Sequence, residues 1–256
     1  MGSRLLLFMF LKLTHSNSQC FIQQKNRRFV YSLIVTENNI QLFHFDRSGS
    51  FHTIRVNIHE EPAVIVHIVL GISSPNDQAV GFDTSVFWEG DTRYIKTLDE
   101  NKAEITYPLL NPATSFSRRA IRGRGTICWK GHDEQGRLII IKDAWRSRDR
   151  TPEWELLKKV KGLEGVGQMV AWEEDDLTTS KLRGFDAEKL STFLDFRDRI
   201  FSRITLEAYG KTIDHFQSRE EFLYAFRDAV AGKLFFVGLI PYSYTFGVFR
   251  APKSMG

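Results

Sequence analysis

Two stretches of sequence decide the fold of this 256-residue chain: Gly123-Arg124-Gly125-Thr126-Ile127-Cys128-Trp129-Lys130 and, after seven further residues, Leu138-Ile139-Ile140-Ile141-Lys142. The first predicts a glycine pair that leads into a strand, and the second predicts an apolar strand that ends in lysine. Because glycine has no Cβ, phosphate oxygens can approach its backbone closely. A lysine on the neighbouring strand can place a positive charge on those phosphates. Together the two stretches predict a nucleotide site.

A lysine in this role must itself be held, and a glutamate on the next helix can do so as a partly buried ion pair. The sequence Thr151-Pro152-Glu153 is a good helix start, and apolar residues then follow about one turn apart. Glu155 is the first candidate for the partner of Lys142, and Glu153 is the second. In the alternative interpretation, Lys142 is a solvated strand end and the glycines are ordinary turn residues.

These segments resemble the fungal-type protein kinase family, a divergent branch of the protein-kinase-like fold. The resemblance rests on residues 123–130, 140–145 and 155–157, and it extends to 26–30, 45–49 and 222–230. It implies ATP on a glycine loop that contains Gly123 and Gly125. It also implies that Lys142 contacts the ATP phosphates and that Glu155 orients Lys142.

A kinase needs more than this ATP-binding site. A catalytic Asp must orient the acceptor hydroxyl, and an Asn and a second Asp must hold magnesium. In this family they follow the helix with Arg227-Asp228-Ala229-Val230, but here no Asp or Glu occurs after Asp228. We therefore assign no catalytic residue and no Mg²⁺ site, and expect a pseudokinase that binds ATP without transferring phosphate. A non-catalytic interaction module or a truncated gene-model fragment is the alternative. We interpret the acid-free tail from about Lys233 as a translated intron or a frame-shifted sequence.

The predicted fold class is α+β. The expected regions are an irregular or amphipathic start (1–25), an α+β region with an antiparallel meander (26–115), a kinase-like N-lobe (116–172) and an incomplete helical C-lobe with an aberrant tail (173–256). Helices are predicted over 62–71, from Thr151, within 185–204 and within 218–236. Strands are predicted over 28–35, 40–45, 51–58, 85–89, 92–98, 103–110, 120–122, 126–130 and 138–142.

Composition narrows the classes of function. With 42% hydrophobic and 26% charged residues the chain can form a packed core, and a net charge of +4 does not predict a nucleic-acid partner. The run Leu5 to Leu11 is too short to span a bilayer, so no membrane partner is expected. Cys20 and Cys128 are too few for a disulfide scaffold or a four-cysteine zinc site. We expect a cytoplasmic or nuclear protein, with secretion through a leader in residues 1–19 as the less favoured alternative.

Other polar clusters have simpler explanations than a site. His44 and His52 fall in predicted strands without a Cys or Glu at ligand spacing. Asp46 with Asp83 and Glu89 could mimic the carboxylates of a nuclease, but capping of its own turn explains Asp46 more simply. The tryptophans are expected in packing rather than in base stacking, because no basic stripe interleaves them.

Overall fold

The computed structural model describes residues 2–163, 166–174, 176–185, 196–208 and 216–227, and it contains two antiparallel sheets. In the first sheet, β1, β2 and β3 are consecutive neighbours and β4 also pairs with β2. The strands are β1 (Val30–Val35), β2 (Asn39–Asp46), β3 (Gly49–His52) and β4 (Val56–Asn57). The predicted meander is therefore confirmed. The predicted strand over 51–58 is instead interrupted, and its two ends form parts of β3 and β4.

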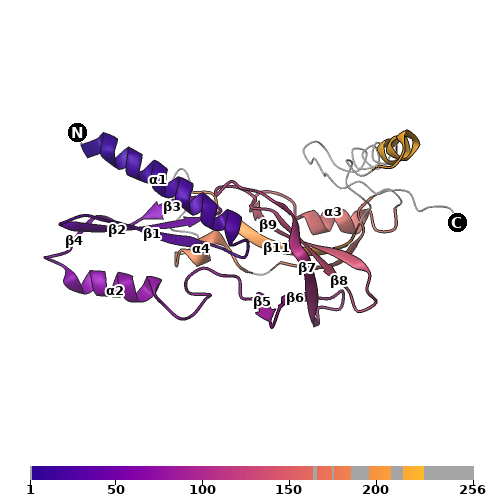
Figure 1. Cartoon of the computed structure of the whole chain (residues 1–256), viewed down its shortest axis with the longest axis horizontal. Helices are drawn as coiled ribbons and strands as arrows, with labels where there is room; N and C mark the ends of the chain where they lie inside the picture. The colour runs from indigo at the N-terminus through magenta and orange to yellow at the C-terminus, as the bar shows by residue number, and fades with distance from the viewer. Residues whose placement is uncertain (1, 164–165, 175, 186–195, 209–215, 228–256) are drawn as a thin grey trace.

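The first sheet has one helix on each side (Figure 1). The helices are α1 (Gly2–Gln23) and α2 (Pro62–Ile72). Phe21 of α1 is 2% exposed and packs with Phe43 and Phe45 of β2. Phe43 and Phe45 are two positions apart in the strand, so both side chains point to the same face of the sheet. Full burial of one such aromatic side chain stabilises the fold by about 1.5–3 kcal/mol. The start of the chain therefore contributes to the core.

The second sheet has seven strands in the order β10-β11-β9-β8-β7-β6-β5. They are β5 (Val86–Glu89), β6 (Thr92–Leu98), β7 (Glu104–Ser117), β8 (Ile127–His132), β9 (Leu138–Ser147), β10 (Met169–Glu173) and β11 (Arg199–Glu207). The short helices α3 (Glu153–Lys159) and α4 (Thr179–Leu182) belong to the connections, and residues 219–227 are also helical.

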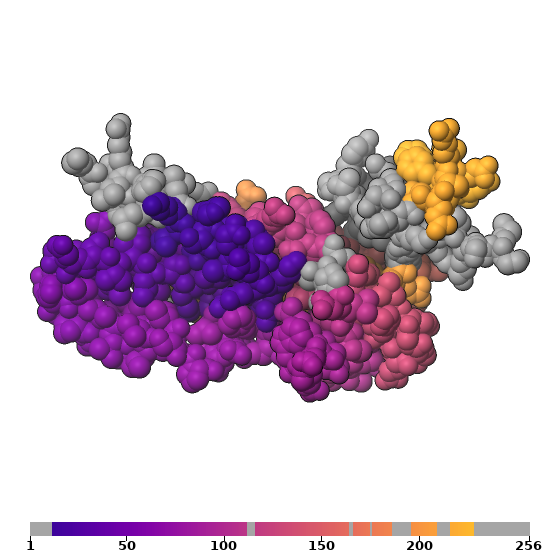
Figure 2. Space-filling view, in the orientation of Figure 1, coloured from indigo at the N-terminus to yellow at the C-terminus, as the bar shows by residue number. Residues whose placement is uncertain are grey.

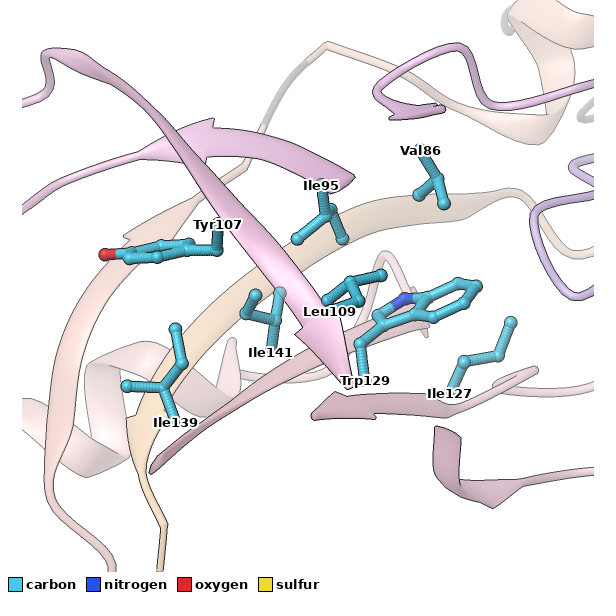
Figure 3. Close-up of a cluster of buried hydrophobic side chains, with 8 residues drawn as sticks. All are labelled: Val86, Ile95, Tyr107, Leu109, Ile127, Trp129, Ile139 and Ile141. Carbon is cyan, nitrogen blue, oxygen red and sulfur yellow. The ribbon is translucent and has the colours of Figure 1, made fainter. Parts of the chain in front are cut away.

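The second sheet curls on itself, because side chains from distant strands share one core. Ile95 of β6 and Ile141 of β9 are both fully buried in the same cluster as Trp129, although two strands separate β6 from β9. Figure 3 shows the eight side chains of this cluster gathered between the strands. β6 also contacts β10. The concave inner face is therefore enclosed by its own sheet, while α3 contacts β10.

The hairpin turn between β2 and β3 joins the two sheets. Asp46 binds Arg183 through two hydrogen bonds of 2.6 and 2.8 Å, and the Ser48 hydroxyl lies 2.6 Å from that of Thr179. Arg47 Nη1 donates to the carbonyl of Ala120 at 3.0 Å. Asp46, Arg47 and Ser48 thus each bind a segment more than 70 positions away. The parts of the chain that carry the two sheets form one continuous surface in Figure 2.

Two further sequence predictions need correction. The helix predicted within 185–204 is wrong at its C-terminal end, where Arg199–Glu207 forms β11 between β9 and β10. Residues 201–206 are buried on both faces, so the period-two pattern of a half-exposed strand does not appear in the sequence. Residues 120–122, predicted as a strand, lie in the loop before β8. The rest of the predicted helix, 186–195, lies outside the described residues.

The α+β class holds as a mixed fold of mostly antiparallel sheets with few helices. The predicted boundary between residues 115 and 116 falls inside β7, and strands from both sides of it pair in one sheet. The division into domains stays a prediction. Within the described part of the chain, no helix is both long enough and apolar enough to cross a membrane.

Candidate functional site

Lys142 lies in the middle of β9, on the face of the second sheet that is directed away from the enclosed core. Ile141 and Asp143 are buried on the inner face, whereas Lys142 and Ile140 are half-buried on the outer face. Ile140 packs there with Leu157 of α3 and Ile204 of β11. The predicted strand therefore exists, and it continues to Ser147 rather than ending at the lysine.

The carboxylate that pairs with Lys142 belongs to Glu153, the first residue of α3. Lys142 Nζ donates to Glu153 Oε1 at 2.5 Å and to Oε2 at 2.7 Å. The two side chains are 17% and 21% exposed, so the pair is largely shielded from water. The predicted glutamate on the following helix is present, but it is the second candidate, Glu153, that meets Lys142, and Glu155 lies two residues further along α3.

Cys128 faces the same side of the sheet as Lys142, since the two residues are cross-strand partners in β8 and β9. Burial raises the pKa of the Cys128 thiol to about 11, although the nearby Lys142 charge acts in the opposite direction. From the sequence alone, this cysteine is considered only for a disulfide scaffold or a zinc site. The hairpin geometry that brings it beside Lys142 could have been read from the turn at residues 132–137.

We expect Cys128 to resist alkylation in the folded protein. With a pKa of about 11, about one molecule in a thousand carries the thiolate at pH 8, and the thiolate is the nucleophile. Iodoacetamide labelling followed by peptide mass spectrometry should find Cys128 slower than in urea-unfolded protein by on the order of a hundredfold. Equal labelling rates in the two states would contradict the buried environment.

The two predicted glycines lie in the loop between β7 and β8, and they have different surroundings. Both have positive φ, +140° at Gly123 and +49° at Gly125. A Cβ on Gly123 would meet no atom within 4 Å, whereas a Cβ on Gly125 would lie 2.3 Å from Arg47 Nε. Gly123 thus has open space beside its Cα, although its amide donates to the Arg47 carbonyl at 3.0 Å, while Gly125 makes room for the buried Arg47 side chain. Gly125 lies beside the inner face of β9, where it lines a cavity together with Asp143 and Trp145 and without Lys142.

Replacing Gly125 with alanine should destabilise the fold by about 2–4 kcal/mol, from left-handed strain plus overpacking against Arg47. Gly136 is the matched control, because it has φ +73° and open space around it. Gly136→Ala should cost only the strain, about 1 kcal/mol. Urea unfolding of both variants checks this. Equal losses would show that the contact with Arg47 has no energetic role.

The inner face of β9 is held by a buried charge network around Arg203 of β11. Arg203 is 1% exposed and donates to both carboxylate oxygens of Asp143, at 2.6 and 3.0 Å, and to Asp83 Oδ2 at 3.0 Å. Its Nη1 also reaches the Lys96 carbonyl at 2.9 Å and Ser85 Oγ at 2.7 Å. Burial alone would lower the pKa of Arg203, but Asp143 and Asp83 raise it. Because Asp143 follows Lys142 directly, this network fixes the strand that carries the lysine.

A magnesium site is not assigned. Among the described residues, no three His, Cys, Asp or Glu side chains are grouped as metal ligands would be. Asp83 and Asp46 are each engaged by arginines, and Asp46 Oδ1 also accepts from the Ser48 amide at 2.7 Å, the turn capping that the sequence predicts. The segment 228–256, where the tail prediction falls, lies outside the described residues.

Fold and site together define a mixed α/β protein with a sheet lysine that a glutamate from the next helix holds in place. The model of the fungal protein kinase family matches residues 8–184, which include most of α1 and every predicted site residue. The chain therefore belongs to the fungal protein kinase family, as its sequence segments indicate. Comparison with curated proteins and with solved structures gave no match.

Proposed function

We propose that this chain is a kinase-like protein that binds the phosphates of ATP beside Lys142. The observation that carries the proposal is the Lys142–Glu153 ion pair on β9 and α3. In protein kinases an ion pair between a strand lysine and a glutamate of the next helix positions the lysine for the nucleotide phosphates. Family membership supports the same role.

Each residue has a defined part in this proposal. Lys142 Nζ donates to both carboxylate oxygens of Glu153, and this pair would hold its positive charge in place for the nucleotide phosphates. Gly123 leaves space beside its Cα for a ligand to approach, although its amide already donates to the Arg47 carbonyl at 3.0 Å. Gly125 positions the loop through its contact with Arg47. When bound, ATP would supply the phosphate charge that Lys142 meets, and residues 116–172, which contain β8, β9 and α3, would form the kinase-like N-lobe.

The proposal is confined to binding. Phosphoryl transfer depends on metal ions that neutralise charge and on an aspartate that orients the acceptor. We assign none of these to the described residues and propose a pseudokinase. Because Cys20 and Cys128 form no disulfide with one another, a reducing compartment suits the chain, and we place it in the cytoplasm or the nucleus.

Fluorescent mant-ATP titration tests the proposal. The intact chain should bind mant-ATP, and unlabelled ATP should displace it. Lys142→Ala should weaken binding by about tenfold or more, because a charge-assisted contact contributes about 1.5–3 kcal/mol. Lys96→Ala is the control, since Lys96 forms an exposed strand ion pair with Glu104.

The two glutamates give a sharper comparison on one helix. Glu153→Gln should weaken mant-ATP binding by removing the charge that holds Lys142, whereas Glu155→Gln should bind like the parent chain. Absence of mant-ATP binding at millimolar concentration would reject the proposal. Equal affinity of the parent chain and Lys142→Ala would reject the assigned lysine.

A further inference from the structure

A small polar cavity lies where the first sheet, the start of the chain and the end of the curled second sheet meet. Its volume is about 20 Å³. Asp143 and Trp145 of β9, Ile127 of β8 and Phe201 of β11 contribute from the inner face of the second sheet. The remaining lining residues come from the chain before β1, from the β2–β3 turn, and from the loops before β5 and β8.

Positive charge dominates this cavity. Lys25, Arg27, Arg28 and Arg47 line it, against the two carboxylates of Asp83 and Asp143. Both carboxylates already accept hydrogen bonds from Arg203. Cationic groups therefore outnumber acids around the cavity even before Arg203 is counted. Arg28 is paired with Asp83 at 3.0 Å, whereas the hydrogen bonds of Arg47 Nη1 go to backbone carbonyls and not to either of these carboxylates. Because a buried cation is costly without a counter-charge, the surroundings of Arg47 favour an anion as a partner.

Two of the arginines also have unused donors. Arg47 is 1% exposed, and the hydrogen bonds from its Nη1 go to backbone carbonyls at Ala120 and Ile121. Among the described residues, no acceptor meets Arg47 Nε or Arg28 Nε, and both atoms are buried. Burial lowers the pKa of Arg47 to about 10, with Asp46 acting in the opposite direction. The guanidinium of Arg47 is thus desolvated without full compensation.

We propose that this cavity binds a single monoatomic anion, chloride under ordinary ionic conditions, between Arg47 and Arg28. The size decides the class of ligand. A water molecule needs a cavity of about 10–15 Å³, so a cavity of about 20 Å³ suits an ion of similar size. A water molecule alone would satisfy donors but would leave the excess charge in place. Nothing covalent is involved.

The anion site is separate from the proposed nucleotide site. Asp143 and Trp145 face the cavity, whereas Lys142, which directly precedes Asp143, points to the opposite face of β9. The site instead lies at the junction of both sheets, beside Gly125 and the turn that contains Arg47. An anion there would strengthen the contact between the two parts of the fold.

The experiment is ³⁵Cl NMR of the full chain in chloride, with bromide as competitor. We expect the ³⁵Cl signal to be broader with the protein than in buffer alone, and bromide should reverse this extra broadening. The extra broadening should be at least fivefold smaller in Arg47→Met. Arg93→Met is the matched control, because Arg93 Nε is likewise buried and unpartnered but does not line the cavity. Its broadening should equal that of the parent chain.

A second measurement does not depend on a variant that folds. Crystals of the parent chain soaked in bromide should show an anomalous peak in the cavity between Arg47 and Arg28. Absence of that peak, or broadening that Arg47→Met leaves unchanged, would overturn the proposal. Displacement of bromide by inorganic phosphate at lower concentration would also overturn it, because the site would then select an oxyanion. Loss of mant-ATP binding in Lys142→Ala would leave the chloride result unaffected.

Discussion

Arg203→Met should lower the free energy of unfolding by about 3–5 kcal/mol. The methionine fills much of the arginine volume but leaves Asp83 and Asp143, 4% and 5% exposed, without their shared cation. Burial by itself would raise the pKa of Asp83, and the charges of Arg203 and Arg28 hold it below its usual value. Urea unfolding followed by tryptophan fluorescence measures the loss, since Trp129 Nε1 donates to Asp143.

The stranded carboxylates, rather than lost packing, are the expected cause of this loss. Adding Asp83→Asn and Asp143→Asn to Arg203→Met should therefore recover part of the stability, because asparagine keeps an acceptor for Trp129 without the charge. Arg137→Met removes an arginine from an exposed ion pair and should leave the unfolding midpoint nearly unchanged. If the triple variant is no more stable than Arg203→Met, burial of unpaired charge is the wrong explanation.

The sequence predicts the local elements well and the chemistry of the site in part. The spacing from the glycine loop to Lys142 and on to the helix start places the lysine and a glutamate together, because β8, β9 and α3 follow one another with short connections. This spacing does not determine which of the two glutamates, Glu153 or Glu155, pairs with Lys142. Residues two apart on a helix differ in direction by about 200°, so only one of Glu153 and Glu155 can face the strand, and the position of the helix start decides which.

The contacts that join the sheets could not be predicted. Arg203 meets Asp83 across 120 positions and Asp46 meets Arg183 across 137, and no periodicity in the sequence connects such pairs. The sequence does not predict the strand β11 for a related reason. Its buried polar residues, Ser202, Arg203 and Thr205, are satisfied by neighbouring strands and loops, so its composition does not read as a core strand.

Asp46→Asn should destabilise the chain by about 3–5 kcal/mol, because it leaves Arg183 buried beside a neutral amide. Asp46 is fully buried and the Arg183 side chain is 6% exposed. The amide can still accept from the Ser48 backbone, so the turn itself should persist and the loss should come from the ion pair. Urea unfolding at pH 7 gives the magnitude.

The pH dependence separates this charge effect from a packing effect. Burial alone would raise the pKa of Asp46, but His44 and Arg183 hold it below its usual value. A carboxyl with a lower pKa in the folded state contributes stability above about pH 4, and that contribution is lost as the pH falls through the folded-state pKa. The gap between parent and Asp46→Asn should therefore narrow below pH 4. Asp133→Asn, which alters a turn-capping aspartate paired with the exposed Arg137, should show a much smaller gap than Asp46→Asn. A gap for Asp46→Asn that stays constant into the acid range would mean that shape, not charge, joins the two sheets at this turn.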